Sequence, residues 1–303
     1  MLTAQIERYI SRRQMLGYKL KDTRRELLLF ARFAADRGDT HLRIATATAW
    51  ANRTPSPHAR HQRMRRIHLM ARSLHAEDKA HEVPPMDPFR HRYRRPLPYI
   101  YSPEEISRLI GATRQLRNCL LRKETYATLI GLIAATGLRI SEAMNLRFDD
   151  VFPGGILNIR MTKFGKSRLV PLHPTAKEAL DHYLTLRQKV PTPDEHVFIG
   201  SRSRRPWSQT VNFTFRRLLK LAGIAPVRGR APRIHDLRHT FATRALEQCP
   251  SDHQSVGRHF VALSTYLGHV DVKNTFWYLE ATPELMSQIA RAAEKYSPTG
   301  GPQ

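Results

Sequence analysis

Apolar residues recur along much of this chain at every third or fourth position, which is the spacing of an amphipathic helix. In the first part of the chain this pattern predicts an all-helical region. A long helix is predicted from His58 to Glu77, with three apolar residues on one face: Ile67, Met70 and Leu74. Further along, segments 156–161 and 168–172 predict two strands joined by a turn. The predicted fold class is therefore mainly α with a small antiparallel β-sheet.

A segment rich in proline and arginine divides the chain. Five prolines and four arginines lie between Glu82 and Pro98, which predicts a stiff, basic, extended linker. Directly after it, Ser102, Pro103 and Glu105 have the order of a helix N-cap, a first-turn proline and a capping-box glutamate. We therefore predict a helical domain over 1–82, a linker over 83–101 and a second domain over 102–303.

The second domain combines the strand pair with several predicted helices. Their apolar spacing and flanking turn residues place them over 123–136, 141–146, 208–222, 236–248 and 259–267. A last helix is predicted over 283–296. The domain is therefore expected to be a mixed α/β domain with a C-terminal helix.

The balance of charge indicates a polyanionic partner. The chain has 50 Lys and Arg residues against 26 Asp and Glu residues, a formal net charge of +24. Residues 1–98 and 99–303 each contribute +12 (21 minus 9, and 29 minus 17), so both domains are expected to face the same partner. Nucleic acid is the first candidate, and a ribosome-associated or merely basic protein is the alternative.

Several protein classes are disfavoured by other features. Two cysteines, Cys119 and Cys249, are too few for a disulfide framework or a cysteine-rich zinc site and indicate reduced thiols. No run of 18 apolar residues is present, and the first residues lack the apolar block of a signal peptide. The sequence therefore predicts a cytoplasmic protein without a membrane partner.

The predicted helix over 58–77 is strongly basic as well as amphipathic. A helix of this kind fits the major groove of DNA, although a solvated basic face would show the same pattern. The candidate DNA-binding residues are Arg60, Arg63, Arg65 and Arg66 of this helix and Arg92, Arg94 and Arg95 of the linker.

Two motifs in the second domain place cations where a phosphate could bind. In TGLRISEAMNL, residues 136–146, Arg139 stands at a helix start, where a guanidinium and backbone N–H groups favour an anion. Glu142 follows three positions later and could hold Arg139, or form an ordinary ion pair on the helix surface. In TKFGKSRLVPL, residues 162–172, Lys163 could protonate a leaving oxygen, or serve only solubility at a turn.

A third motif, RIHDLRHTFAT at residues 233–243, combines a proton-transfer group with a cation. His235 and Arg238 are three residues apart and face one direction on a helix, which suits an anionic centre. A zinc site through His235 and His239 is the rival interpretation. It is disfavoured because Asp236 stands where the metalloprotease motif requires glutamate, and no metal is predicted.

A fourth motif, YLGHVDVKNTFWYLE at residues 266–280, contains a candidate nucleophile. Tyr278 follows His269 by nine positions, and a tyrosine oxygen can form a covalent intermediate. For the tyrosine alone, a packed aromatic side chain beside Phe276 and Trp277 is the ordinary alternative.

Taken together and in this order, the four motifs resemble those of the tyrosine recombinase (phage integrase) family, and in particular its Xer-like integrases. The resemblance covers the chain from Ser102 to Glu280. It implies a catalytic set of Arg139, Lys163, His235, Arg238, His269 and Tyr278, with Glu142 in a supporting position.

The resemblance also implies a function and a mode of assembly. A recombinase of this family attacks double-stranded DNA with its tyrosine, forms a 3′-phosphotyrosyl bond and proceeds through a Holliday junction without a cofactor. It would act as a two-domain clamp in a synaptic tetramer, with sister recombinases as further candidate partners, in the integration, excision or transposition of a mobile element. The alternatives are a type IB topoisomerase and a non-catalytic DNA-binding accessory factor.

Overall fold

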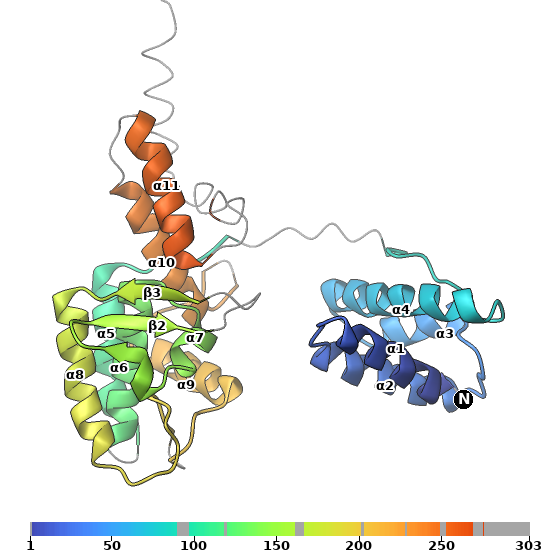
Figure 1. The fold of residues 1–303 in the computed structure, drawn as a ribbon, viewed down its shortest axis with the longest axis horizontal. Helices are drawn as coiled ribbons and strands as arrows, with labels where there is room; N and C mark the ends of the chain where they lie inside the picture. Colours follow the sequence, from blue (N-terminus) through green and yellow to red (C-terminus); the bar gives the residue numbers. More distant parts are fainter. Residues whose placement is uncertain are drawn as a thin grey trace, which may run out of the picture. The chain divides into compact units, whose positions relative to one another are not determined.

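The computed structural model describes residues 2–89, 97–117, 120–160, 167–200, 203–227, 229–248, 253–268 and Thr275. The chain divides into an N-terminal unit, residues 1–96, and a C-terminal unit, residues 97–303, each with its own hydrophobic core (Figure 1). Helices predominate in both, and the C-terminal unit adds a three-stranded antiparallel sheet, which confirms the predicted fold class. No described helix is long and apolar enough to cross a membrane.

The N-terminal unit packs four helices around apolar side chains. The helices are α1 (Leu2–Met15), α2 (Lys21–Ala35), α3 (Ile44–Asn52) and α4 (Pro57–Glu77). The Ser56 side chain caps α4 by accepting from the backbone N–H of Ala59 at 3.3 Å, and Pro57 occupies the first helical turn. The predicted apolar face of α4 is buried, with Ile67, Met70 and Leu74 at most 1% exposed.

Three histidines at seven-residue intervals on α4 hold the segment that follows the helix. Each uses its Nδ1 atom, so the chain after α4 turns back along the helix (Figure 1). The backbone carbonyls can only accept, so His68 and His75 donate to them. The pairs are His75 with the His81 carbonyl at 2.6 Å, His68 with the Pro84 carbonyl at 2.7 Å and His61 with the Asp87 carboxylate at 3.1 Å.

Residues near both described ends of the segment predicted as a linker, 83–101, pack against the hydrophobic cores. Val83 and Phe89 lie against the core of the N-terminal unit. Tyr101 is fully buried in the core of the C-terminal unit, and Tyr99 packs against that core. The proline-rich composition did not indicate these apolar and histidine contacts. Residues 90–96 lie outside the described residues.

The C-terminal unit is built around α6, which packs against helices α5, α8 and α10. The predicted capping box at the start of α5 is present, with Glu105 N–H donating to Ser102 Oγ and Ser102 N–H to Glu105. The elements are α5 (Pro103–Ala112), η1 (Thr113–Gln115), α6 (Leu120–Thr136), α7 (Ile140–Met144), η2 (Phe148–Asp150), β1 (Val151–Phe152), β2 (Ile156–Ile159), β3 (Arg168–Pro171), α8 (Pro174–Gln188), α9 (Ser208–Leu221), α10 (Ile234–Glu247) and α11 (His253–Leu267).

The sheet has the order β1-β2-β3, and its inner face joins the core through Leu157, Ile159 and Val170. Ile159 pairs with Arg168 at the end of the β2–β3 hairpin. Both predicted strands are present, and the two-residue β1 was missed because it is too short to show a pattern. Helix α11 begins six residues before its predicted start, since Gly257 interrupts the helical pattern in the sequence. The predicted helix over 283–296 lies outside the described residues.

The histidine contacts predict how firmly the segment after α4 is held. Replacing His68 with alanine removes the donor to the Pro84 carbonyl, a hydrogen bond worth about 1 kcal/mol. Amide hydrogen exchange of residues 81–89 should therefore become about fivefold faster in His68→Ala. The neighbouring Leu69→Ala, which changes a 39% exposed side chain on the same helix, should leave that exchange unchanged. Equal exchange in both variants would refute the contact.

Candidate active site

The C-terminal unit brings together four of the residues that the sequence singled out. Arg139 is the N-cap residue of α7, and Glu142 lies in the first turn of that helix. His235 and Arg238 lie in the first turns of α10. The other predicted catalytic residues, Lys163, His269 and Tyr278, lie outside the described residues, as do Arg92, Arg94 and Arg95.

Arg139 and Arg238 converge on the carboxyl end of α11. Arg238, which is 1% exposed, donates from Nη1 to the Gly137 carbonyl at 2.6 Å and from Nη2 to the Leu267 carbonyl at 2.8 Å. Arg139 donates to the carbonyls of Leu267 and Gly268 at 3.5 and 3.3 Å. The last carbonyls of a helix lack partners within it and attract cations. The helix end therefore gathers two guanidinium groups from separate elements.

Glu142 is the carboxylate that holds Arg139. It accepts from the Arg139 side chain at 2.6 Å and from the Arg139 backbone N–H at 3.0 Å. A third arginine, Arg168, donates to both Glu142 oxygens at 3.2 and 2.8 Å. Burial alone would raise the pKa of Glu142, but the two arginines outweigh it and lower that pKa to about 2. Glu142 is therefore ionised throughout the physiological range.

His235 is neutral at physiological pH. Burial is the largest cause, and the positive charges of Arg238, Arg233 and Arg139 add to it, so that its pKa falls to about 4 despite the opposing charge of Asp236. Its ring meets that of His239 edge to face, with centroids 4.8 Å apart. A neutral imidazole beside two arginines can accept a proton from a hydroxyl group, or form a hydrogen bond at a site that binds an anion.

Arg168 is a member of the cluster that the sequence analysis did not single out. It is the first residue of β3, and only its place next to the predicted turn hinted at a role. Its side chain is 12% exposed, although an arginine on a short strand beside a turn is usually solvated. The sequence could not show that the first turn of α7 supplies a buried carboxylate, Glu142, for it.

Two glycines of the motifs allow this close packing. Gly137 has a φ of +62°, and a Cβ atom there would lie 2.5 Å from the Phe241 ring. Gly268 has a φ of +66°, and a Cβ atom there would lie 2.7 Å from the Arg168 guanidinium. Side chains at either position would force the cluster apart. The glycines in the TGLR and LGH segments therefore allow the turns and also allow Phe241 and Arg168 to pack close to the backbone.

The arginines of α4, which include the four candidate DNA-binding residues and Arg72, differ in their contacts and exposure. Arg60 donates to the carbonyls of Thr54 and Pro55, at 2.9 and 3.2 Å. Arg63 donates to Glu26 at 3.3 Å and lies over the Trp50 ring. Arg65 is exposed, as is Arg72 one heptad further along, and Arg66 is half-buried. The two internally bonded arginines therefore stabilise the N-terminal unit itself, while Arg65 and Arg72 present their charge to solvent.

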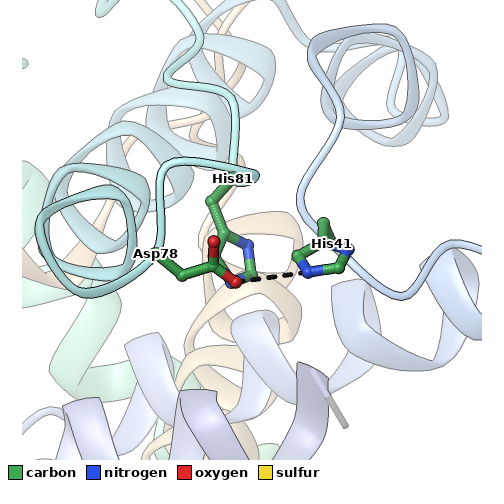
Figure 2. A group of neighbouring side chains, drawn as sticks. All are labelled: His41, Asp78 and His81. Atoms are coloured by element: carbon green, nitrogen blue, oxygen red, sulfur yellow. Dashed lines mark ion pairs between the residues drawn. The ribbon is translucent and has the colours of Figure 1, made fainter.

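One group of described side chains has the spacing of a metal site: His41, Asp78 and His81 (Figure 2). His41 Nε2 lies 3.2 Å from Asp78 Oδ2. The Nδ1 atom of His81 accepts the backbone N–H of Leu42 at 3.0 Å, so its lone pair is already used and the neutral ring carries its proton on Nε2. A nitrogen that bears a proton cannot bind a metal. These hydrogen bonds therefore fit a structural histidine, and burial lowers its pKa in agreement.

Comparisons with known proteins give a consistent result. Residues 101–284 match the family model described as "Phage integrase family". The protein y4rB of Sinorhizobium fredii (strain NBRC 101917 / NGR234), which is named as an integrase/recombinase, is 37% identical over 301 residues, covering 96% of each chain. The tyrosine recombinase XerD of Brucella abortus (strain 2308) is 24% identical over 255 residues, covering 82% of this chain and 80% of its own.

A solved structure shares the fold. The lambda integrase tetramer bound to a Holliday junction superimposes with a TM-score of 0.62 at 19% identity, covering 89% of this chain and 77% of that chain. At this level of identity the likeness shows that the fold is the same, since similar folds serve many functions.

The Glu142 ion pairs predict a specific loss of stability. Glu142→Gln leaves two arginines without their carboxylate and should lower the free energy of unfolding by about 3 kcal/mol at pH 7. The ordinary pKa of the carboxyl is 4.5, so this stabilisation is full above pH 4.5 and is lost as pH falls towards 2.

Urea unfolding at pH 7 and at successively lower pH measures both effects. Glu195→Gln is the matched control, because Glu195 forms an exposed pair with Arg147 and should cost less than about 1 kcal/mol. If Glu142→Gln were no more destabilising than this control, Glu142 would not be the anchor of the cluster.

Proposed function

Because this chain belongs to the phage integrase family and is a tyrosine recombinase, we propose that it cleaves and rejoins DNA with Tyr278 as nucleophile and with Arg139 and Arg238 around the scissile phosphate. One observation carries the proposal. Two arginines from α7 and α10 meet at the carboxyl end of α11, directly before the segment that contains His269 and Tyr278.

The reaction is an in-line exchange at phosphorus. The Tyr278 oxygen attacks the scissile phosphate, a P–O bond to tyrosine forms, and the bond from phosphorus to the 5′ oxygen breaks. The phenolic proton leaves, and the departing 5′ oxygen gains a proton. Since one phosphate ester replaces another, the bond energy is kept in the phosphotyrosyl link and no cofactor is needed. Attack by a 5′-hydroxyl of a second strand reverses the step and joins the new partner.

Each remaining group has a role that its chemistry supports. Two guanidiniums stabilise the negative charge of the transition state, and Glu142 keeps Arg139 in place. Neutral His235 accepts a proton from Tyr278 or hydrogen-bonds the phosphate. The negative charge of a bound phosphate opposes the lowering of the His235 pKa by burial and the arginines. Lys163 protonates the leaving oxygen and His269 donates to a non-bridging oxygen.

Both units contribute to binding double-stranded DNA as a clamp. The exposed arginines of α4 supply affinity from the N-terminal unit, and arginines 92, 94 and 95 extend the basic surface along the linker within residues 83–101. Wrapping a duplex with two basic units explains why each half of the chain carries a net charge of +12.

The assembly follows from the need to exchange two duplexes. Four subunits, each cleaving one strand, form a synaptic tetramer, as lambda integrase does on its Holliday junction. The predicted helix over 283–296 docks between subunits, and a sister recombinase is a further candidate partner. The relative named integrase/recombinase supports a mobile element as the natural substrate. We infer a cytoplasmic location, where the protein has access to DNA.

The covalent step can be tested directly. Wild-type protein should form a covalent adduct with a nicked suicide substrate that carries the recombination site. Tyr278→Phe lacks the attacking oxygen and should form none, while binding the same DNA with a Kd within about twofold of wild type, because phosphate contacts dominate affinity. Denaturing gels and band shifts measure the two quantities.

The same experiment separates the alternatives. Site-specific binding without an adduct in the wild type would favour a DNA-binding accessory factor. Relaxation of a supercoiled plasmid that lacks the site, without strand exchange between two sites, would favour a type IB topoisomerase. Adduct formation that requires the site, followed by strand exchange, supports the recombinase.

The internally bonded and the exposed arginines of α4 predict different phenotypes. Arg65→Ala and Arg72→Ala each remove an exposed charge and should reduce the slope of log K against log salt by about one. Arg63→Ala removes an internal contact to Glu26 and Trp50, so it should lower the Tm instead. Salt-dependent band shifts and thermal melts distinguish these effects. An unchanged slope in both exposed variants would place DNA on another face.

A further inference from the structure

Arg168 connects three parts of the C-terminal unit. As the first residue of β3, it pairs with Ile159 across the β2–β3 hairpin. Its Nε donates to the Tyr266 carbonyl at 2.7 Å, and its terminal nitrogens donate to the two oxygens of Glu142 at 3.2 and 2.8 Å. The hairpin, α7 and the carboxyl end of α11 therefore meet on one guanidinium.

The contact with Glu142 uses the planar shape of arginine. Two parallel N–H donors face two carboxylate oxygens, while the third donor direction serves a carbonyl. A lysine ammonium is a point charge without this fork and cannot make all three contacts in one geometry. Because the same carboxylate also holds the side chain and backbone of Arg139, the position of Arg168 is transmitted to Arg139 through Glu142.

The packing of Gly268 shows how closely this guanidinium approaches the backbone at the end of α11. A Cβ atom on Gly268 would lie 2.7 Å from Nη1 and 3.0 Å from Cζ of Arg168. Such an approach leaves no room for a side chain, so the guanidinium lies directly against the backbone that leads into His269. Along the chain, Arg168 comes five residues after Lys163.

We propose that Arg168 is a positioning residue for DNA cleavage, which fixes Arg139 through Glu142 and holds the carboxyl end of α11 against the β2–β3 hairpin. The proposal rests on the proposed function, since it assigns Arg139 to the scissile phosphate. Arg168 affects the position of the Arg139 guanidinium at the scissile phosphate. It does not determine the affinity for DNA, which depends on the many other phosphate contacts.

The expected result is a loss of cleavage rate without a loss of binding. In single-turnover cleavage of a nicked suicide substrate at saturating protein, Arg168→Gln should be about 100-fold slower than wild type, with a Kd within about twofold. Arg168→Lys restores the charge without the fork and should remain at least about tenfold slow. If Arg168→Gln fails to fold, Arg168→Lys still tests the proposal, because it keeps the positive charge.

Arg187 provides a matched control for a purely structural role. It is another buried arginine of the same unit, 3% exposed, and it donates to the carbonyls of Asp194 and His196 on α8's C-terminal side. Arg187→Gln should lower the Tm yet cleave at nearly the wild-type rate per bound protein. Equal slowing of cleavage in Arg187→Gln and Arg168→Gln would overturn the proposal.

A modified substrate identifies the step that Arg168 supports. Sulfur in place of the bridging 5′ oxygen gives a leaving group that departs without a proton. This substrate should restore cleavage by Lys163→Ala, which lacks the proposed proton donor, but not by Arg168→Gln. Rescue of Arg168→Gln would show that it acts through the proton donor, contrary to the proposal. Glu142→Gln combined with Arg168→Gln should be no slower than the slower single variant.

Failure of the proposed function has a different signature. If wild-type protein forms no adduct with either substrate, the recombinase chemistry itself is wrong. If wild type cleaves, Lys163→Ala is rescued and Arg168→Gln cleaves as fast as wild type, only the role of Arg168 is wrong.

Discussion

The carboxyl end of α11 is the feature on which the candidate site depends. A helix end leaves its last carbonyls without intrahelical partners and concentrates the negative end of the helix dipole. Here the carbonyls of three consecutive residues, 266–268, accept from Arg168, Arg139 and Arg238. Cations from a strand, a short helix and a long helix, which would repel one another, are thereby held together by these carbonyls and by Glu142. Neutral acceptors orient these guanidiniums without cancelling their charge.

The single carboxylate in this group leaves a surplus of positive charge. Among the described residues, Glu142 pairs with Arg139 and Arg168, and Arg238 is held by two carbonyls. His235 is neutral, and Arg233 is paired with Asp236 at 2.7 Å. Three positive charges and one negative charge leave a net of about +2, which matches the charge that develops on a pentacoordinate phosphate. A second carboxylate would make the arginine cluster more stable, but the cluster would then stabilise the negative charge of the phosphate less well. The site is therefore built to be completed by an anion.

The sequence predicted the elements well and the long-range partners poorly. The helix over 58–77, the capping box at Ser102 and the strand pair depend on local patterns, and the structure has them within a few residues. The spacing of Glu142 from Arg139 left an ordinary ion pair open, and its supporting position was an implication of the family resemblance. Arg168 could not be identified, because its carboxylate and its carbonyl come from residues that only the fold brings near. The same limit applies to His61 and His68 of α4, whose partners lie on the segment that composition predicted to be a linker.

The two kinds of arginine in this protein meet different physical demands. Arg238 is 1% exposed and bound to two carbonyls, so it loses no freedom when a phosphate arrives, and the low polarity around it strengthens its field. Arg65 and Arg72 are exposed on α4, where water and salt screen them, and a mobile exposed cation contributes affinity by releasing counterions rather than by fixing geometry. Burying an arginine costs folding free energy, whereas an exposed arginine does not hold its guanidinium in one position. Placing them in separate units allows affinity to be changed at the surface of α4 while the arrangement at the end of α11 stays fixed.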